Sequence, residues 1–266
     1  MIRPTVIFSA AFLLAACACS RSVADELPVL PLQRLSLPQE LLTVKPPAIT
    51  NHPVWKSSVA LGFTITKGNS DTMLAVANLQ TSRRSQANEW LFGADGAYGE
   101  DNAVKNRDTL HSFGQFNHFF TSRLFVFGRL DGLHDGIKDI KYRLSASIGL
   151  GYYLVQRTNT SLVFEAGPSL VSERQGNQTD TYSALRLAER FDQQLNAAAR
   201  LWQTAEFIPQ VDKTANFIFN AELGIETVIT KELSLRVAVQ DNYVNQPAAT
   251  YKNNDFRLIS GLSYKF

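Results

Sequence analysis

Residues 255–266 read DFRLISGLSYKF, and their alternation decides the fold class. One parity is apolar apart from Ser260 and holds Phe256, Leu258, Leu262, Tyr264 and Phe266. The other parity is polar apart from Ile259 and holds Arg257, Gly261, Ser263 and Lys265. Because a β-strand turns successive side chains to opposite faces, this stretch predicts a strand with one apolar and one polar face.

The same pattern recurs along the chain from Val54 onward. It predicts twelve strands, near residues 54–66, 72–84, 89–99, 108–120, 123–134, 142–155, 159–171, 182–193, 196–208, 215–229, 233–245 and 255–266. Each segment is long enough for the roughly 9–11 residues that a membrane-spanning strand needs. We therefore predict an all-β fold, an antiparallel transmembrane β-barrel of about 12 strands with apolar residues outside and polar residues inside. A soluble β-sandwich gives the same alternation with the opposite sense.

The connections between the segments supply an independent signal. Every second connection is short, at residues 85–88, 121–122, 156–158, 194–195 and 230–232. The others are generally longer and more polar, for example 100–107, 135–141, 172–181 and 246–254, and the exception is the five-residue turn 67–71. Outer-membrane barrels have short periplasmic turns and longer external loops, and an even number of strands puts both termini in the periplasm. This rhythm favours the outer membrane of a Gram-negative bacterium.

Two of the predicted strands alternate less cleanly than the others. In segment 108–120, Phe113 shares a parity with Gln115 and Asn117, and in segment 182–193 the parity of Leu185 also holds Glu189. We expect an irregular register or a β-bulge in these two segments.

The residues before the strands divide into two parts. Residues 1–24 predict a secretory signal peptide, because an apolar run from Val6 to Ala16 is too short to span a bilayer. Two processing routes are open, cleavage after Ala24 or lipidation at Cys17, since Leu14 to Cys17 resembles a lipobox. Residues 25–53 predict a Pro-rich periplasmic linker, because six of the ten prolines lie there. The barrel is then expected over residues 54–266.

Charge and cysteine usage exclude several functions. The chain has 26 Lys and Arg against 24 Asp and Glu, and two of the arginines lie in the acid-free leader, so the remainder is neutral. Without a basic excess we expect no nucleic-acid partner. Both cysteines, Cys17 and Cys19, also lie in the leader, which leaves no disulfide framework and no cysteine metal site behind it.

Twelve charged residues fall on the polar parity and are candidates for the barrel lumen. They are Arg129, Asp131, Arg143, Glu165, Arg186, Arg190, Arg200, Glu206, Glu222, Glu226, Arg236 and Arg257. Seven are arginines, which form planar, bidentate pairs with carboxylates. The set fits a salt-bridged interior that holds a structural envelope protein closed, and it also fits a narrow channel with a mild anion preference. A barrel of this size lies between filled eight-stranded barrels and wide porins, so both interpretations remain open.

Scattered histidines raise an enzymatic alternative, an outer-membrane hydrolase built on His111, Ser112 or His118. A hydrolase needs a nucleophile within hydrogen-bond reach of an oriented base. Neighbours on a strand point to opposite faces, so His111 and Ser112 cannot meet in this way. We therefore expect no enzyme activity, no catalytic residues, no cofactor and no metal site. A lipid-anchored periplasmic β-protein is the other alternative.

Several motifs in order resemble the YdiY-like family of salt-induced outer-membrane proteins, a domain family of unknown function. The resemblance covers roughly residues 55–266. Its carriers are Trp55, Gly62, Gly68 to Ser70, Tyr142 with Arg143, Gly149 to Tyr152, Glu206 with Pro209, Leu233 to Leu235, Tyr243, Pro247, Asp255, Gly261, Tyr264 and Phe266.

The family resemblance implies an outer-membrane location and an osmotic response, and no established chemistry. The final strand also resembles the closing strand of outer-membrane barrels, in which Tyr264 and Phe266 would form a C-terminal insertion signal. The expected partners are therefore outer-membrane lipid and the barrel assembly machinery.

Overall fold

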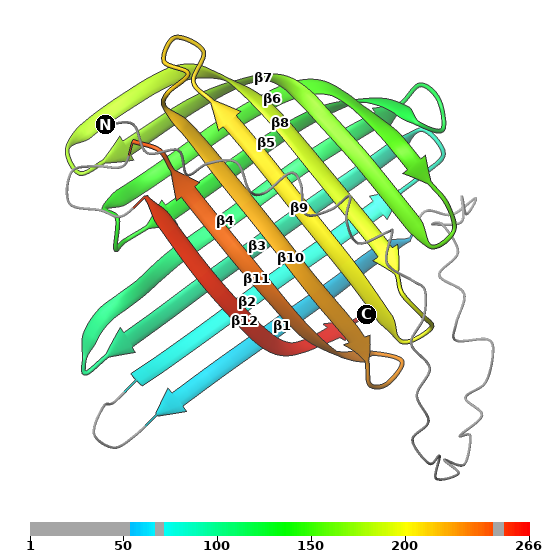
Figure 1. The fold of residues 1–266 in the computed structure, drawn as a ribbon, viewed down its shortest axis with the longest axis horizontal. Helices are drawn as coiled ribbons and strands as arrows, with labels where there is room; N and C mark the ends of the chain where they lie inside the picture. The colour runs from blue at the N-terminus through cyan, green and yellow to red at the C-terminus, as the bar shows by residue number, and fades with distance from the viewer. Residues whose placement is uncertain (1–53, 67–71, 247–252) are drawn as a thin grey trace, which may run out of the picture. The chain divides into compact units, whose positions relative to one another are not determined.

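A computed structural model describes residues 54–66, 72–246 and 253–266, and this part of the chain forms a closed antiparallel barrel of twelve strands (Figure 1). The strands are β1 (Trp55–Thr66), β2 (Thr72–Arg84), β3 (Asn88–Asp101), β4 (Val104–Phe119), β5 (Leu124–Asp135), β6 (Ile140–Gln156), β7 (Thr160–Gln175), β8 (Gln178–Gln194), β9 (Ala199–Pro209), β10 (Phe217–Val228), β11 (Leu233–Val244) and β12 (Asn254–Lys265). Each strand pairs with its neighbours in sequence, and β12 pairs with β1. The predicted fold class is confirmed.

Some of the predictions lie outside the described residues. These are the leader 1–24 with Cys17, the linker 25–53, the turn 67–71 and most of the loop 246–254. Among the described residues no helix has the length and apolar character needed to cross a membrane.

Three of the distal connections are shorter than the sequence predicted. We call the end where β1 begins and β12 finishes the proximal end, and the opposite end the distal end. The proximal turns are short, as predicted, but the predicted distal loops 100–107 and 172–181 are mostly strand, and loop 135–141 is reduced to residues 136–139. The connection from β9 to β10, residues 210–216, is longer. Asn102 and Ala103 alone join β3 to β4, with φ of 49° and 60°, the positive values of a tight type I′ hairpin. The polar composition of these segments marks paired hairpins that extend the wall.

The strands turn their apolar face outward and their polar face inward, as predicted for a membrane barrel. Large apolar side chains point outward, for example Leu130, Ile148 and Leu258, which are 66%, 61% and 67% exposed. Small polar side chains on the opposite parity are buried, including Ser147, Ser234 and Ser263. With this sense and a closed sheet, the chain does not form a β-sandwich.

The register irregularities lie outside both of the segments in which they were predicted, since the β3–β4 shift falls opposite Lys105 to Arg107, just before segment 108–120. β8 pairs with both β7 and β9 without a shift, so the irregularity expected in 182–193 is wrong. Shifts occur between β3 and β4 at Gly99, between β5 and β6 near Asp135, and at both ends of the β6–β7 pair. The mixed polarity of segment 108–120 has another cause, because β4 turns aromatic as well as polar side chains into the lumen.

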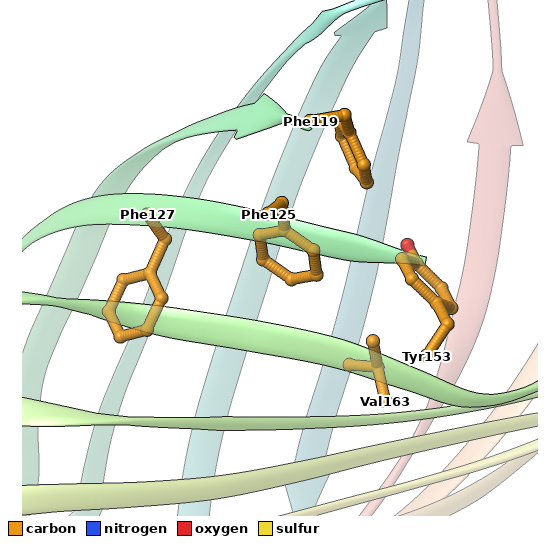
Figure 2. Close-up of a cluster of buried hydrophobic side chains, with 5 residues drawn as sticks. All are labelled: Phe119, Phe125, Phe127, Tyr153 and Val163. Atoms are coloured by element: carbon orange, nitrogen blue, oxygen red, sulfur yellow. The ribbon is translucent and has the colours of Figure 1, made fainter. Parts of the chain in front are cut away.

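Two apolar clusters occupy the inner face of the barrel. Phe119, Phe125, Phe127, Tyr153 and Val163, from β4 to β7, form one of them (Figure 2). Val171, Ala184, Ile208 and Ile218, from β7 to β10, form the other. The Phe125 ring lies where a Cβ at Gly151 would stand, so the glycine of β6 lets this ring pack against the wall.

The seam between β1 and β12 is the shortest strand pairing in the barrel. Its register runs only from Ser58↔Lys265 to Leu61↔Leu262, and two backbone hydrogen bonds of 3.0 and 3.1 Å join Ser57 to Phe266. Beyond this segment β1 and β12 diverge toward the distal end (Figure 1). Ile259, the apolar exception on its parity, lines a small recess on the inner side of the seam together with Ala60, Gly62, Ala238 and Gly261.

Candidate functional site

The candidate site is the barrel interior, which holds a cavity of about 1710 Å³. Its lining reaches from proximal turns, such as Arg157 and Thr158, to distal residues, such as Lys138 and Asp255. It therefore follows the length of the barrel.

All twelve of the predicted lumen charges line this cavity. The lining also holds six further basic side chains and six further acidic ones, so the small excess of arginine does not grow. The further basic residues are Lys56, Arg84, Arg107, Lys138, Arg157 and Lys265, and the acidic ones are Glu89, Asp95, Asp135, Glu189, Asp192 and Asp255. With nearly equal numbers, the electrostatics of the interior depend on which charges are paired.

A continuous series of hydrogen bonds and ion pairs, which we call the interior belt, runs around the inner face of the barrel wall. Its centre is Arg186, which contacts Glu165 at 2.9 Å and Glu206 at 2.6 Å. Gln115 donates to Glu165 at 2.9 Å, and Asn220 donates to Glu206 at 3.2 Å. Arg186 and Glu165 are among the most buried charged residues, and each has its polar atoms engaged, as buried charges require.

The bond from Gln115 to Glu165 is a chord of the barrel, because it joins β4 to β7 and passes over β5 and β6. The inward positions of β6 in this region are Ser147, Gly149 and Gly151. Their small side chains leave room for the chord. The chord therefore narrows the lumen on this side.

The interior belt continues in both directions from its centre. On one side Gln115 donates to Asn117, which donates to Glu89, and Glu89 pairs with Arg84 at 3.5 Å. On the other side the bonds run from Asn220 through Asn242 to Arg257, whose Nη2 donates to Asn242 at 2.5 Å. The belt therefore connects β2 with β12 around the lumen.

A second cluster lies beside the seam. Glu222 accepts hydrogen bonds from Trp202 Nε1 at 2.6 Å, Gln240 at 2.6 Å and Arg236 at 3.0 Å. Arg236 also lies over the Trp202 ring, 4.5 Å from its centroid, and reaches Asn78 of β2 at 3.4 Å. This last contact spans the two strands of the seam from the inside.

An ion pair crosses the distal mouth. Lys138, in the turn between β5 and β6, lies 2.6 Å from Asp255 at the start of β12. Asp135 holds this turn by accepting the backbone N–H groups of Ile137 and Lys138, and Gln175 donates to the Lys138 carbonyl. We call the Lys138–Asp255 pair the distal latch, because it joins two distant strands across the opening.

The other predicted charges form local pairs or stand apart. Arg129 contacts Asp131 at 2.5 Å, and His111 lies between Asp131 and Asp95, 2.9 Å from the latter. Further pairs are Arg143 with Glu173, Arg200 with Asp192, and Glu226 with Lys265. Within the described ranges, Arg190 and Arg257 have no carboxylate at ion-pair distance.

Sequence reasoning missed the aromatic part of the interior. Phe113, Phe119, Phe127 and Trp202 point inward, and Arg129, Arg84, Arg186 and Arg236 respectively lie over their rings, 4.1 to 5.3 Å from the centroids. These residues share the parity of predicted lumen charges on their own or neighbouring strands. An aromatic residue on the same parity as a predicted lumen arginine is therefore the sequence signal that could have identified these inward aromatic side chains.

The histidines are not arranged for hydrolysis. His111 faces the cavity, whereas Ser112 is exposed on the outer face. His118 bonds to Asn88, and His134 bonds to the Lys141 carbonyl. In the part of the chain that the structure describes, no cluster of His, Cys, Asp and Glu is arranged to hold a metal ion.

Residues 59–266 match the model of a family described as protein of unknown function, DUF481. The chain belongs to this family. The match confirms the resemblance to the YdiY-like proteins. No curated protein matches the chain.

Several solved structures are similar to the barrel at low sequence identity. The KdgM porin is 10% identical, with a TM-score of 0.44 over 80% of this chain and 99% of its own. The NanC porin is 8% identical, with a TM-score of 0.45 over 79% of this chain and 96% of its own. An outer-membrane channel from Pseudomonas putida F1 is 10% identical, with a TM-score of 0.48 over 84% of this chain and 99% of its own. We draw no functional conclusion from similarities at this level.

Proposed function

We propose that this DUF481 protein is an outer-membrane β-barrel of a Gram-negative bacterium and forms a narrow diffusion channel for small polar solutes. The proximal end would face the periplasm, and no catalytic residue would be involved. The observation that carries the proposal is the cavity of about 1710 Å³, which is lined by charged residues from the proximal turns to the distal mouth.

The outer surface supports the membrane part of the proposal. Every strand except β9 exposes a large apolar side chain by more than a third, a surface that a soluble monomer rarely presents. Aromatic pairs border this surface near both ends, Trp90 with Phe116 at 4.5 Å proximally and Phe207 with Phe217 at 5.2 Å distally. Aromatic girdles at both interfaces are typical of outer-membrane barrels.

The membrane location has a direct test. The expressed protein should fractionate with outer membranes and should migrate faster on a detergent gel before boiling than after it, because a closed barrel resists unfolding in detergent. Folded protein in the soluble periplasm without detergent would contradict the location. Mass spectrometry of the mature N-terminus would distinguish cleavage after Ala24 from lipidation at Cys17.

The channel part is tested by reconstitution. The full mature protein, refolded and added to planar bilayers, should give discrete conductance steps in KCl. Folded protein that gives no steps over a wide voltage range would overturn the channel.

A structural role in the envelope is the second candidate. The interior belt favours it, because buried hydrogen-bonded pairs from β2 to β12 brace the wall. The same bilayer experiment decides between the two, since a purely structural barrel has no conductance.

The closing strand carries a further part of the proposal. Tyr264 and Phe266 lie on the outer face of β12, 51% and 69% exposed, where the barrel assembly machinery could read them during insertion. Replacing both residues with Ser should lower the amount of protein in the outer membrane, measured by fractionation. Unchanged insertion would contradict the signal.

A further inference from the structure

Resting on the proposed channel, we infer that the pore selects small oxyanions, such as carboxylates and phosphates, through arginines whose charge the barrel leaves uncompensated. The total numbers of lumen charges are nearly equal, so the inference depends on which charges are already paired. The acidic residues of the lumen are almost all paired, whereas several of the basic residues are not.

The lumen carboxylates are engaged by nearby donors. Glu165 and Glu206 accept from Arg186, Glu222 from Arg236, and Glu226 from Lys265. Asp131 pairs with Arg129, Asp192 with Arg200, and Asp255 with Lys138. Asp95 contacts His111, Glu89 contacts Arg84, and Asp135 accepts two backbone N–H groups. Only Glu189, whose parity points outward with Leu185 and Leu187, lacks such a partner among the described residues.

Arg190 is an unpaired cation in the proximal half of the lumen. It lines the cavity and is partly buried, and within the described chain no carboxylate approaches it to ion-pair distance. The acidic groups that act on it from further away are the Tyr153 phenol and the carboxylates of Glu165, Glu89 and Asp192. Each of the three carboxylates already pairs with another arginine, so the guanidinium of Arg190 keeps donors for a passing anion.

Arg257 and Arg107 form a second cationic position near the distal mouth. Arg257 donates through Nη2 to Asn242, but its Nε is buried without a hydrogen-bond partner. Arg107 acts on it as a like charge, and the acids that act on it are Asp95, Asp255 and Asp135, all engaged as described. A buried unpaired donor beside a second guanidinium fits the planar oxygens of a carboxylate or phosphate.

The two positions lie toward opposite ends of the cavity. An anion entering at the distal mouth meets Arg107 and Arg257 first and Arg190 later. Arg157 and Lys56 lie at the proximal rim, where the described residues likewise offer them no ion pair. Among the described lumen carboxylates, each one that points inward already has a partner, so a cation gains less along this path than an anion does.

The test is ion selectivity in planar bilayers. With a KCl gradient, the reversal potential of the wild-type channel should show a preference for chloride over potassium, about fivefold for two unpaired charges near an aqueous path. The Arg190→Gln/Arg257→Gln variant should lose this preference and keep its conductance steps. The matched control, Arg200→Gln/Asp192→Asn, removes a paired cation together with its acid and should keep the preference.

A binding readout addresses the class of anion. Inorganic phosphate added to the KCl solution should reduce the chloride current, and Arg107→Gln/Arg257→Gln should relieve that block. Arg257→Lys retains the charge without the planar donors, and should keep the chloride preference while weakening the block.

The outcomes separate this inference from the proposed function. Absence of any conductance would overturn the channel itself. Conductance that is cation-selective or non-selective, or a chloride preference that survives the Arg190→Gln/Arg257→Gln change, would overturn the assignment to these arginines while the channel stands. A phosphate block that persists in Arg107→Gln/Arg257→Gln would overturn the distal oxyanion position.

Discussion

The wall formed by β6, β7 and β8 and the seam between β1 and β12 are built from the same alternating pattern, yet they differ in how firmly they are joined. β7 and β8 pair without interruption from Thr160↔Gln193 to Gln175↔Gln178, whereas β1 and β12 pair only from Ser58 to Leu61. Arg186 and Glu165 join the wall through buried ionic contacts, whereas glycine and aliphatic residues such as Gly62 and Ile259 line a recess at the seam. The comparison predicts that the wall contributes more to the stability of the closed sheet than the seam does.

The largest expected effect comes from removing the central arginine of the wall. Arg186→Ala leaves Glu165 and Glu206 with one neutral donor each, and a buried carboxylate that loses its cation costs about 3–5 kcal/mol of unfolding free energy. The matched change near the seam, Arg236→Ala, should cost only about 1–2 kcal/mol, because Glu222 still accepts from Trp202 and Gln240. Urea unfolding in lipid vesicles measures both values. Equal losses would remove the distinction between the two regions.

Hydrogen exchange in detergent tests the difference in pairing directly. Amides of β12 between Asp255 and Ser260 that point toward β1 have no strand partner in the register, so they should exchange at least about a hundredfold faster than the amides of β7. Alternate amides of the same segment pair with β11 and provide the internal control. Equal protection on both sides of β12 would mean that the seam closes along its whole length.

Glycine substitutions test the packing of the wall. Gly151→Ala places a Cβ against the Phe125 ring, and the displaced ring should cost about 1–3 kcal/mol of unfolding free energy. Gly128→Ala on the neighbouring strand is the control, because no atom lies within 4 Å of its Cβ, and it should be neutral or slightly stabilising. The same urea titration distinguishes them, and a neutral Gly151→Ala would show that the aromatic cluster is loosely packed.

The smallest effect is expected at the distal latch, which connects the turn beyond β5 with the strand next to the seam. Lys138→Ala should raise single-channel conductance by a fraction of its wild-type value, because one side chain leaves the mouth. Asp255→Asn should give a similar rise, because it weakens the same contact and leaves Lys138 free to move. Lys138→Arg should keep the ion pair and the wild-type conductance. Unchanged conductance in all three variants would place the narrowest part of the path elsewhere, for instance at the chord from Gln115 to Glu165.

The sequence predicted the strands closely because their period is local. The predicted segment 72–84 has the bounds of β2, and the others differ by a few residues at most ends. The distal hairpins were missed because a paired strand beyond the apolar outer surface has two polar faces and the composition of a loop. The bulge near Gly99 depends on the pairing of β3 with β4, which no single segment contains.

The candidate site divides in the same way. Parity alone placed the twelve charges on the inward face, because the pleat of a strand determines which side a residue occupies. Sequence alone did not show that Arg186 is shared by Glu165 and Glu206, that Gln115 crosses two strands to reach Glu165, or that Arg190 and Arg257 lack a carboxylate. Those relations depend on strand stagger and on the curvature that brings β4 close to β7. The alternation of the sequence thus determined which side chains face the lumen, whereas the closed barrel determined which of the lumen charges form ion pairs and which remain unpaired.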